Sequence, residues 1–149
     1  MWTDTVHRVR RALLLSLATV LSAAVPATAA APTHISIPRF DLLQVNQVVV
    51  HVKPGGSHPL CQAIPITAIR VRVKWSDARG LPRAVVTLKA PGEHARSRNI
   101  TLAGSSDTEP VEFTPRGAFH GGTYKATVTL GGRKKASASF KLTQATKTC

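Results

Sequence analysis

Apolar and polar residues alternate with a period of two along most of the chain beyond residue 45. The clearest segment is Thr67–Trp75, where one set of alternate positions holds Ile69, Val71 and Val73 and the other set is basic. Such alternation predicts a β-strand with one side in a core and the other in water. The same period predicts further strands at Gln47–Lys53, Arg83–Lys89, Arg98–Ala103, Pro110–Thr114, Thr123–Leu130 and Ala136–Leu142.

Glycine and proline separate the expected strands. Gly131-Gly132 predicts a tight chain reversal, and Gly104–Asp107 predicts a second turn. No segment after residue 30 shows a helical period. The pattern therefore predicts an all-β fold, a single antiparallel β-sandwich of about seven strands over residues 45–149. Residues 31–44 are expected to form an N-terminal arm before the first strand.

Three segments resemble the immunoglobulin-like and fibronectin type III-like sandwiches of secreted bacterial proteins. They are Val71–Trp75, the bend from Phe113 to Tyr124, and the final hairpin Tyr124–Leu142. The resemblance implies that Trp75 is a core residue and that the hydroxyl of Tyr124 bonds to nearby backbone. It implies no particular function, because such sandwiches serve adhesion, spacing, carbohydrate binding and inhibition alike.

The first thirty residues have the pattern of a cleavable, helical secretory signal. Arg8, Arg10 and Arg11 precede the apolar run Ala12–Val25, and small residues follow at positions 27–31. The apolar run is shorter than the ~20 residues that span a bilayer, so we expect no permanent membrane anchor. The pattern predicts a protein that is secreted, either extracellular or periplasmic, and the composition is typical of a bacterium.

The chain has two cysteines, Cys61 and Cys149. An even number of cysteines in an exported protein predicts a disulfide. The alternatives are two free thiols or a metal site.

No pattern of a catalytic site is present, and we expect neither an enzyme nor a bound cofactor. The sequence has no Gly-x-Ser-x-Gly elbow, and its carboxylates do not suggest a hydrolytic pair. Three carboxylates lie close together in sequence: Asp107, Glu109 and Glu112. They are expected to belong to a turn and to the outward side of a strand; the alternative is a weak calcium site. The histidines are spread along the chain, so no metal site is expected, although a metal-binding module is kept as an alternative.

The charge balance is strongly basic, with 20 Lys and Arg against 7 Asp and Glu and a net charge of +13. Arg70, Arg72 and Lys74 occupy alternate positions of one expected strand, about 7 Å apart. Together with a basic hairpin tip they predict a face that binds anionic cell-wall or extracellular polymers. The alternative is a solvated basic surface that deters aggregation. The candidate binding residues are Arg70, Arg72, Lys74, Arg133, Lys134 and Lys135.

Besides polymer binding and the metal-binding module, one other function remains open from the sequence. The chain could be an inhibitor or partner-binding protein that offers the loops Gly55–Ile64 and Pro115–Gly122 to another exported protein. Specific nucleic-acid binding is not expected, because no recognition helix exists and the basic face lacks aromatic residues for base stacking. We expect a monomer that acts as a non-catalytic binding or structural module at the cell envelope.

Overall fold

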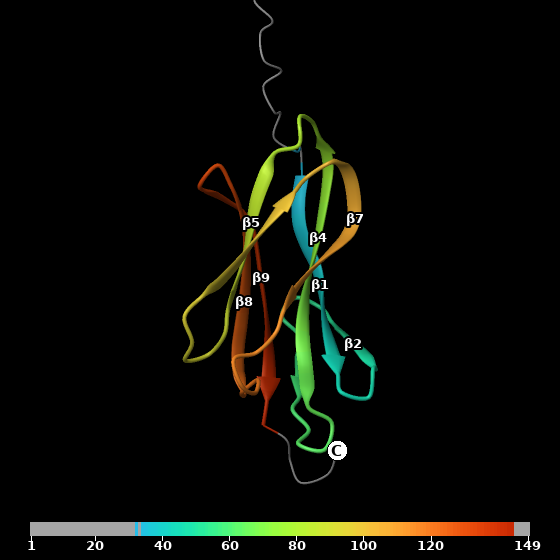
Figure 1. The fold of residues 1–149 in the computed structure, drawn as a ribbon, viewed down its shortest axis with the longest axis vertical. Coiled ribbons are helices and arrows are strands. Elements are labelled where there is room, and N and C mark those ends of the chain that lie inside the picture. Colours follow the sequence, from blue (N-terminus) through green and yellow to red (C-terminus); the bar gives the residue numbers. More distant parts are fainter. Residues whose placement is uncertain (1–31, 33, 145–149) are drawn as a thin grey trace, which may run out of the picture.

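Nine strands form the part of the chain that the structure, a computed structural model, describes, namely residue 32 and residues 34–144 (Figure 1). Asp107 and Thr108 are described in their backbone only. The strands are β1 (His34–Gln44), β2 (Val49–Val52), β3 (Ser57–Pro59), β4 (Ile66–Ala78), β5 (Arg83–Lys89), β6 (Arg96–Thr101), β7 (Gly104–Phe113), β8 (Gly122–Leu130) and β9 (Arg133–Thr143). The expected signal at residues 1–30 and Cys149 lie outside the described residues.

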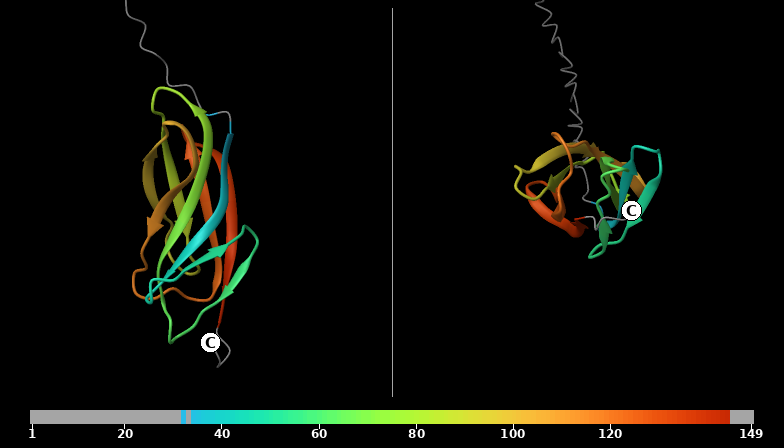
Figure 2. Two further views of the ribbon diagram at one scale, coloured as in Figure 1. Left: turned by 90° about the vertical axis from the view of Figure 1, so that its right-hand side faces the viewer. Right: turned by 90° about the horizontal axis from the view of Figure 1, so that it is seen from below.

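The strands are divided between two sheets. One is four-stranded with the order β2-β1-β4-β7, and the other is five-stranded with the order β3-β9-β8-β5-β6. All strand pairs are antiparallel except β3, which runs parallel to β9. Figure 2 shows the strands running along the long axis of the body, with the two sheets on either side of its interior.

The core lies between the two sheets, and the alternation of the sequence explains why. On β4, Ile69, Val71, Val73 and Trp75 are all buried, as the period of two predicts. Across the interior, the ring of Phe40 on β1 contacts the ring of Phe140 on β9, with centroids 4.6 Å apart. An all-β, sandwich-like fold is therefore confirmed.

Two local predictions are also confirmed. Gly131 and Gly132 have φ angles of 57° and 74°, which a two-residue hairpin turn between β8 and β9 requires. The Tyr124 hydroxyl donates to the carbonyl of His120 at 2.8 Å and accepts from the His120 amide at 3.0 Å. This tyrosine thereby fixes the bend that leads into β8.

The expectation of an N-terminal arm at residues 31–44 is wrong. His34–Gln44 forms β1, which pairs with β2 on one side and with β4 on the other. The pairing of β1 with β4 shifts register between Ser36 and Arg39. This irregularity, next to Pro38, interrupts the alternation of inward and outward residues, so the period of two is hard to recognise in the sequence.

The number of strands and the purely antiparallel arrangement also need correction. Gly104–Asp107, expected to be a turn, begins β7, because Gly104 pairs with Ala78 and Ser106 pairs with Trp75. The short strand β3 lies inside the loop Gly55–Ile64 and pairs in parallel with β9. Tertiary pairing thus overrides the local turn composition at both places.

Candidate functional site

The basic residues predicted on β4 do share the outer face of the four-stranded sheet, but two of them are paired with carboxylates. Arg70 Nε donates to Glu112 Oε2 of β7 at 2.8 Å. Arg72 Nε donates to Asp41 Oδ2 of β1 at 2.5 Å. Lys74 is exposed on the same strand. The stripe therefore carries much less uncompensated charge than its sequence indicates.

Asp41 is the centre of this ion-pair cluster. Its side chain is fully buried, with 0% exposure. Oδ1 lies 2.7 Å from Nδ1 of His51 and 3.2 Å from Nε of Arg39. Burial alone would raise the pKa of Asp41, but the hydrogen bonds from Arg72 and His51 and the charges of Arg72 and Arg39 outweigh it, so the pKa is lowered. The cluster ties β2, β1 and β4 together around an ionised carboxylate.

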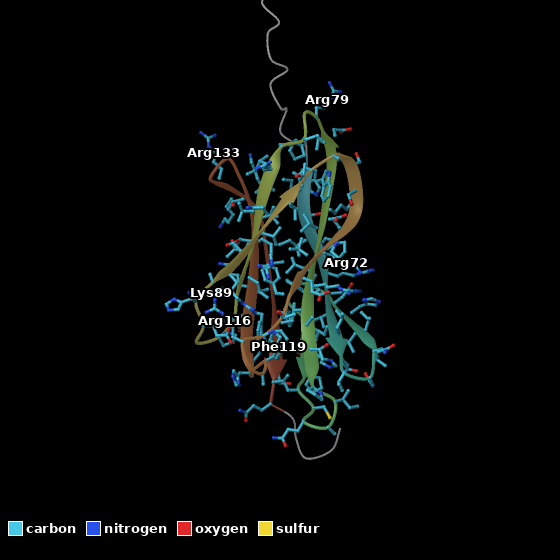
Figure 3. The ribbon with its side chains drawn as sticks, viewed as in Figure 1. Arg72, Arg79, Lys89, Arg116, Phe119 and Arg133 are labelled. Carbon is cyan, nitrogen blue, oxygen red and sulfur yellow. The ribbon has the colours of Figure 1, made fainter. Side chains whose placement is uncertain are left out.

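The second predicted set, Arg133, Lys134 and Lys135, lies at the start of β9, next to the Gly131-Gly132 turn. It belongs to the five-stranded sheet, whereas Arg70, Arg72 and Lys74 belong to the other. Figure 3 shows Arg133 and Arg72 on opposite sides of the molecule. The structure therefore does not bring the two predicted sets together into one binding stripe.

Charge is instead segregated between the two sheets. No strand of the five-stranded sheet contains an aspartate or glutamate. The strands of the four-stranded sheet hold five carboxylate residues and four Lys or Arg. Among the described side chains, every salt bridge found lies on the four-stranded sheet. The five-stranded sheet holds nine Lys and Arg: Arg83, Lys89, Arg96, Arg98, Lys125, Arg133, Lys134, Lys135 and Lys141.

The outer face of the five-stranded sheet is an ordered array of hydroxyl and lysine side chains. Because Tyr124, Ala126 and Val128 of β8 are buried in the core, their neighbours in sequence point outward. One line of cross-strand partners carries a hydroxyl on each of four adjacent strands. We call it the hydroxyl row: Ser97, Thr87, Thr127 and Ser137.

A second line of partners places two lysines directly opposite each other. Lys89 of β5 is the partner of Lys125 of β8, and Ser139 of β9 follows. We call these three residues the lysine row; it lies about 7 Å from the hydroxyl row along the strands. Like charges opposite each other on adjacent strands are destabilising. The lysine row is thus a local electrostatic conflict, and no strand of the same sheet supplies a carboxylate to relieve it.

Lys89 and Lys125 do not stand out in the sequence as binding residues. One indication was present in Thr123–Leu130, whose outward positions are all threonine or lysine. That these residues form rows across the sheet depends on β5, which lies beside β8 and supplies Thr87 and Lys89 at matching positions. Figure 3 shows Lys89 on the same side of the molecule as Arg133.

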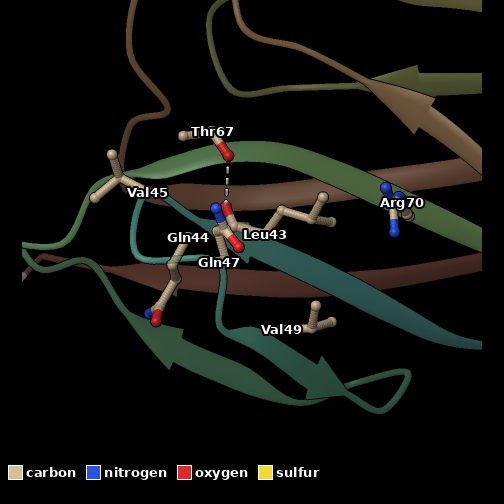
Figure 4. Close-up of a pocket in the computed structure, with 7 residues that line it drawn as sticks. All are labelled: Leu43, Gln44, Val45, Gln47, Val49, Thr67 and Arg70. Carbon is tan, nitrogen blue, oxygen red and sulfur yellow. Dashed lines mark hydrogen bonds between the residues drawn. The ribbon is translucent and has the colours of Figure 1, made fainter.

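A shallow pocket lies at the end of the other sheet, beside the β1–β2 hairpin (Figure 4). It has a volume of about 420 Å³ and is lined by Leu43, Gln44, Val45, Gln47, Val49, Thr67 and Arg70. Val45 is 57% exposed, and Val48 and Val49 are exposed close by. The one charged side chain of the lining, Arg70, is already paired with Glu112. The lining thus combines three apolar residues with three uncharged polar residues and one paired arginine.

The other sequence candidates are dispersed. The described residues include no group of three or more His, Cys, Asp or Glu side chains that could hold a metal ion. Cys61 lies in the loop between β3 and β4, and its expected partner Cys149 lies outside the described residues, so the disulfide stays a prediction. In the described part of the chain, no helix is long and apolar enough to cross a membrane.

Comparison with protein-family models gives no match for this chain, and comparison with curated proteins gives none either.

Proposed function

We propose that the chain is a secreted, non-catalytic binding module that attaches to anionic polymers of the cell envelope or its surroundings. The contact surface is the outer face of the five-stranded sheet. Polymer binding is expected from the net charge, and the segment Arg133–Lys135 remains among the proposed binding residues. Lys89 and Lys125 take the place of the basic residues of β4 as the centre of the binding face.

The observation that carries the proposal is the segregation of charge. The five-stranded sheet holds nine Lys and Arg with no Asp or Glu on its strands, and its lysine row sets like charges side by side. An anionic polymer would supply the missing countercharge. The lysine repulsion that costs stability in the free protein would then become attraction in the complex.

An immunoglobulin-like topology is part of the proposal. With β2 and β3 set aside, seven strands remain, and the first, second and fifth share one sheet. The third, sixth and seventh share the other, as in immunoglobulin constant-type domains. The fourth strand, β6, pairs with the third here, whereas in constant-type domains it joins the first sheet. The Tyr124 hydroxyl bond at the entry to β8 supports the same family of folds.

Secretion rests on the sequence of residues 1–30 and on the pair Cys61 and Cys149. An exported protein meets anionic wall polymers, acidic polysaccharides and membrane surfaces that carry anionic lipids. The strongly basic balance of the chain suits those partners.

The test is retention of the purified protein on an anionic polymer column over a salt gradient. The double variant Lys89→Gln/Lys125→Gln removes the lysine row charges. The matched control Lys53→Gln/Arg79→Gln removes two exposed loop charges outside the strands of either sheet. We expect the protein to bind at low salt, and the lysine row variant to elute at clearly lower salt than the control. Equal elution of the two variants, or no binding by the unmodified protein, would overturn the proposal.

A second candidate function is favoured by the exposed valines of the β1–β2 hairpin. Val45 and Val49 line the pocket and Val48 is their neighbour in sequence; all three expose apolar surface, which suits an exported protein partner. Binding there would be much less sensitive to salt than binding through lysines, and Val45→Lys would abolish it while leaving polymer retention unchanged. This result would replace the first proposal only if the anionic column also fails to retain the protein.

A further inference from the structure

We infer that the ligand of the five-stranded sheet is an acidic polysaccharide, a sugar polymer with carboxylate groups, that lies across the strands. The inference rests on the proposed function, because it names the class of polymer that the same face binds. It comes from the position of the hydroxyl row between two sets of lysines.

The geometry of the sheet places these groups at regular intervals. Neighbouring strands are about 5 Å apart, so the four residues of the hydroxyl row span about 15 Å. The lysine row lies on one side of the hydroxyl row, about 7 Å away along the strands. On the other side, Thr129 of β8 is the partner of Lys134 of β9. A polymer on the hydroxyl row therefore has cations within side-chain reach on both sides.

The hydroxyl row suits sugars better than phosphates. A hydroxyl both donates and accepts hydrogen bonds, as the hydroxyls of a sugar ring do. The Thr87 and Ser97 hydroxyls lie 2.8 Å apart and bond to each other. Within the described residues, the hydroxyls of Thr127 and Ser137 make no hydrogen bond to another side chain. A row of this kind can exchange donors and acceptors with successive rings, whereas a phosphate chain offers acceptors alone.

The type of cation and the position of the aromatic rings also favour a sugar polymer over a phosphate polymer or a nucleic acid. At the outward positions on either side of the hydroxyl row the cations are lysines, Lys89, Lys125 and Lys134, which bind as point charges and lack the fork that matches phosphate. Arg96 and Arg98 flank Ser97 on β6 but alternate with it, so they belong to the other face of the strand, where Arg96 donates to the carbonyl of Thr114. The described aromatic residues, Phe40, Trp75, Phe113, Phe119, Tyr124 and Phe140, are all buried in the core. The face therefore offers no platform for stacking nucleic-acid bases.

The test measures the affinity of the purified protein for two soluble polymers by calorimetry at fixed low salt. Polygalacturonate is the carboxylated sugar polymer, and inorganic polyphosphate is the sugar-free polyanion. The variant Thr87→Val/Thr127→Val removes two hydroxyls and keeps the β-branched shape that strands favour. Ser97→Ala/Ser137→Ala removes the outer two hydroxyls and serves if the first variant does not fold. Lys89→Gln/Lys125→Gln reports on the proposed function itself.

The inference predicts that the hydroxyl variants weaken polygalacturonate binding about fivefold or more and leave polyphosphate binding unchanged within twofold. The lysine variant weakens the binding of both polymers. If a folded hydroxyl variant weakens neither polymer, or both equally, the polysaccharide inference is overturned while the proposed function stands. Tighter binding of polyphosphate than of polygalacturonate by the unmodified protein also overturns the inference. If the lysine variant binds both polymers unchanged, the proposed function fails, and the inference fails with it.

Discussion

The buried carboxylate of Asp41 offers the sharpest test of how the four-stranded sheet is held together. The variant Asp41→Asn removes the charge and nearly preserves the volume of the side chain. Arg72, which is 18% exposed, then loses its charged partner in a place that water reaches poorly. Arg39 and His51 are 39% and 58% exposed and can be hydrated again, so they contribute less to the loss.

The expected magnitude follows from these exposures. Loss of one partner of a fully buried ion pair costs about 3–5 kcal/mol, and a bond to a charged group contributes about 1.5–3 kcal/mol. Because the cations around Asp41 are partly exposed, we expect Asp41→Asn to lower the free energy of unfolding by about 3 kcal/mol. The matched control is Glu112→Gln, whose salt bridge with Arg70 lies at the surface and contributes less than about 1 kcal/mol.

The measurement is urea unfolding of the unmodified protein and both variants between pH 7 and pH 3. The lowered pKa of Asp41 means that the folded state favours the ionised form. Its contribution is therefore complete above the ordinary value of 3.8 and is lost as the pH falls below it. The difference between the protein and Asp41→Asn should shrink toward pH 3. An Asp41→Asn cost no larger than that of Glu112→Gln, or a difference that does not change with pH, would refute the reasoning.

Three further predictions concern other parts of the molecule. Tyr124→Phe removes the hydroxyl that bonds to both backbone groups of His120, and thermal unfolding should show a loss of about 1–2 kcal/mol; an unchanged melting temperature would contradict it. Lys125→Glu turns the repulsion with Lys89 into attraction, so we expect the free energy of unfolding in urea to rise by about 0.5–1 kcal/mol and polymer retention to be lost. An unchanged free energy of unfolding would show that the two side chains do not interact. Burial lowers the pKa of His58, so the folded state favours its neutral form and the free energy of unfolding should fall as the pH drops below 6.5. In unfolding curves at pH 7.5 and 5.5, His58→Gln should show a smaller fall than the unmodified protein. An equal fall in the two proteins would exclude a contribution of His58 to the pH dependence.

The regular strands were predictable because their burial follows from the sequence alone. The alternation in Thr67–Trp75 and Thr123–Leu130 places every second residue in the core, whatever the neighbouring strands are. The Gly131-Gly132 turn was predictable for a similar reason, because positive φ angles at two consecutive residues favour glycine. Local sequence is enough where the local pattern and the fold agree.

The rest could not be read from local sequence. β1 lacks a clean alternation because its register shifts near Pro38, and Asp41 occupies a buried position that a carboxylate rarely takes. Gly104–Asp107 has the composition of a turn, yet pairing with the long strand β4 holds it in β7. These segments take their structure from partners far away in the sequence.

The candidate site shows the same limit. The basic positions of β4 are evident in the sequence, but the carboxylates that pair with them lie on β1 and β7. Conversely, Lys89 and Lys125 are ordinary lysines until the sheet order places β5 beside β8. Which charges are compensated is a property of the sheet pairing, and it decides which face is free to bind an anion.

The most direct test of the account is a nuclear magnetic resonance titration of the isotopically labelled protein with polygalacturonate at low salt. The account predicts that the largest amide shifts occur in β5 and β8 around Thr87, Lys89, Lys125 and Thr127, and that β4 around Arg70 and Arg72 changes little. Shifts confined to the four-stranded sheet or to the β1–β2 hairpin would contradict the assignment of the binding face.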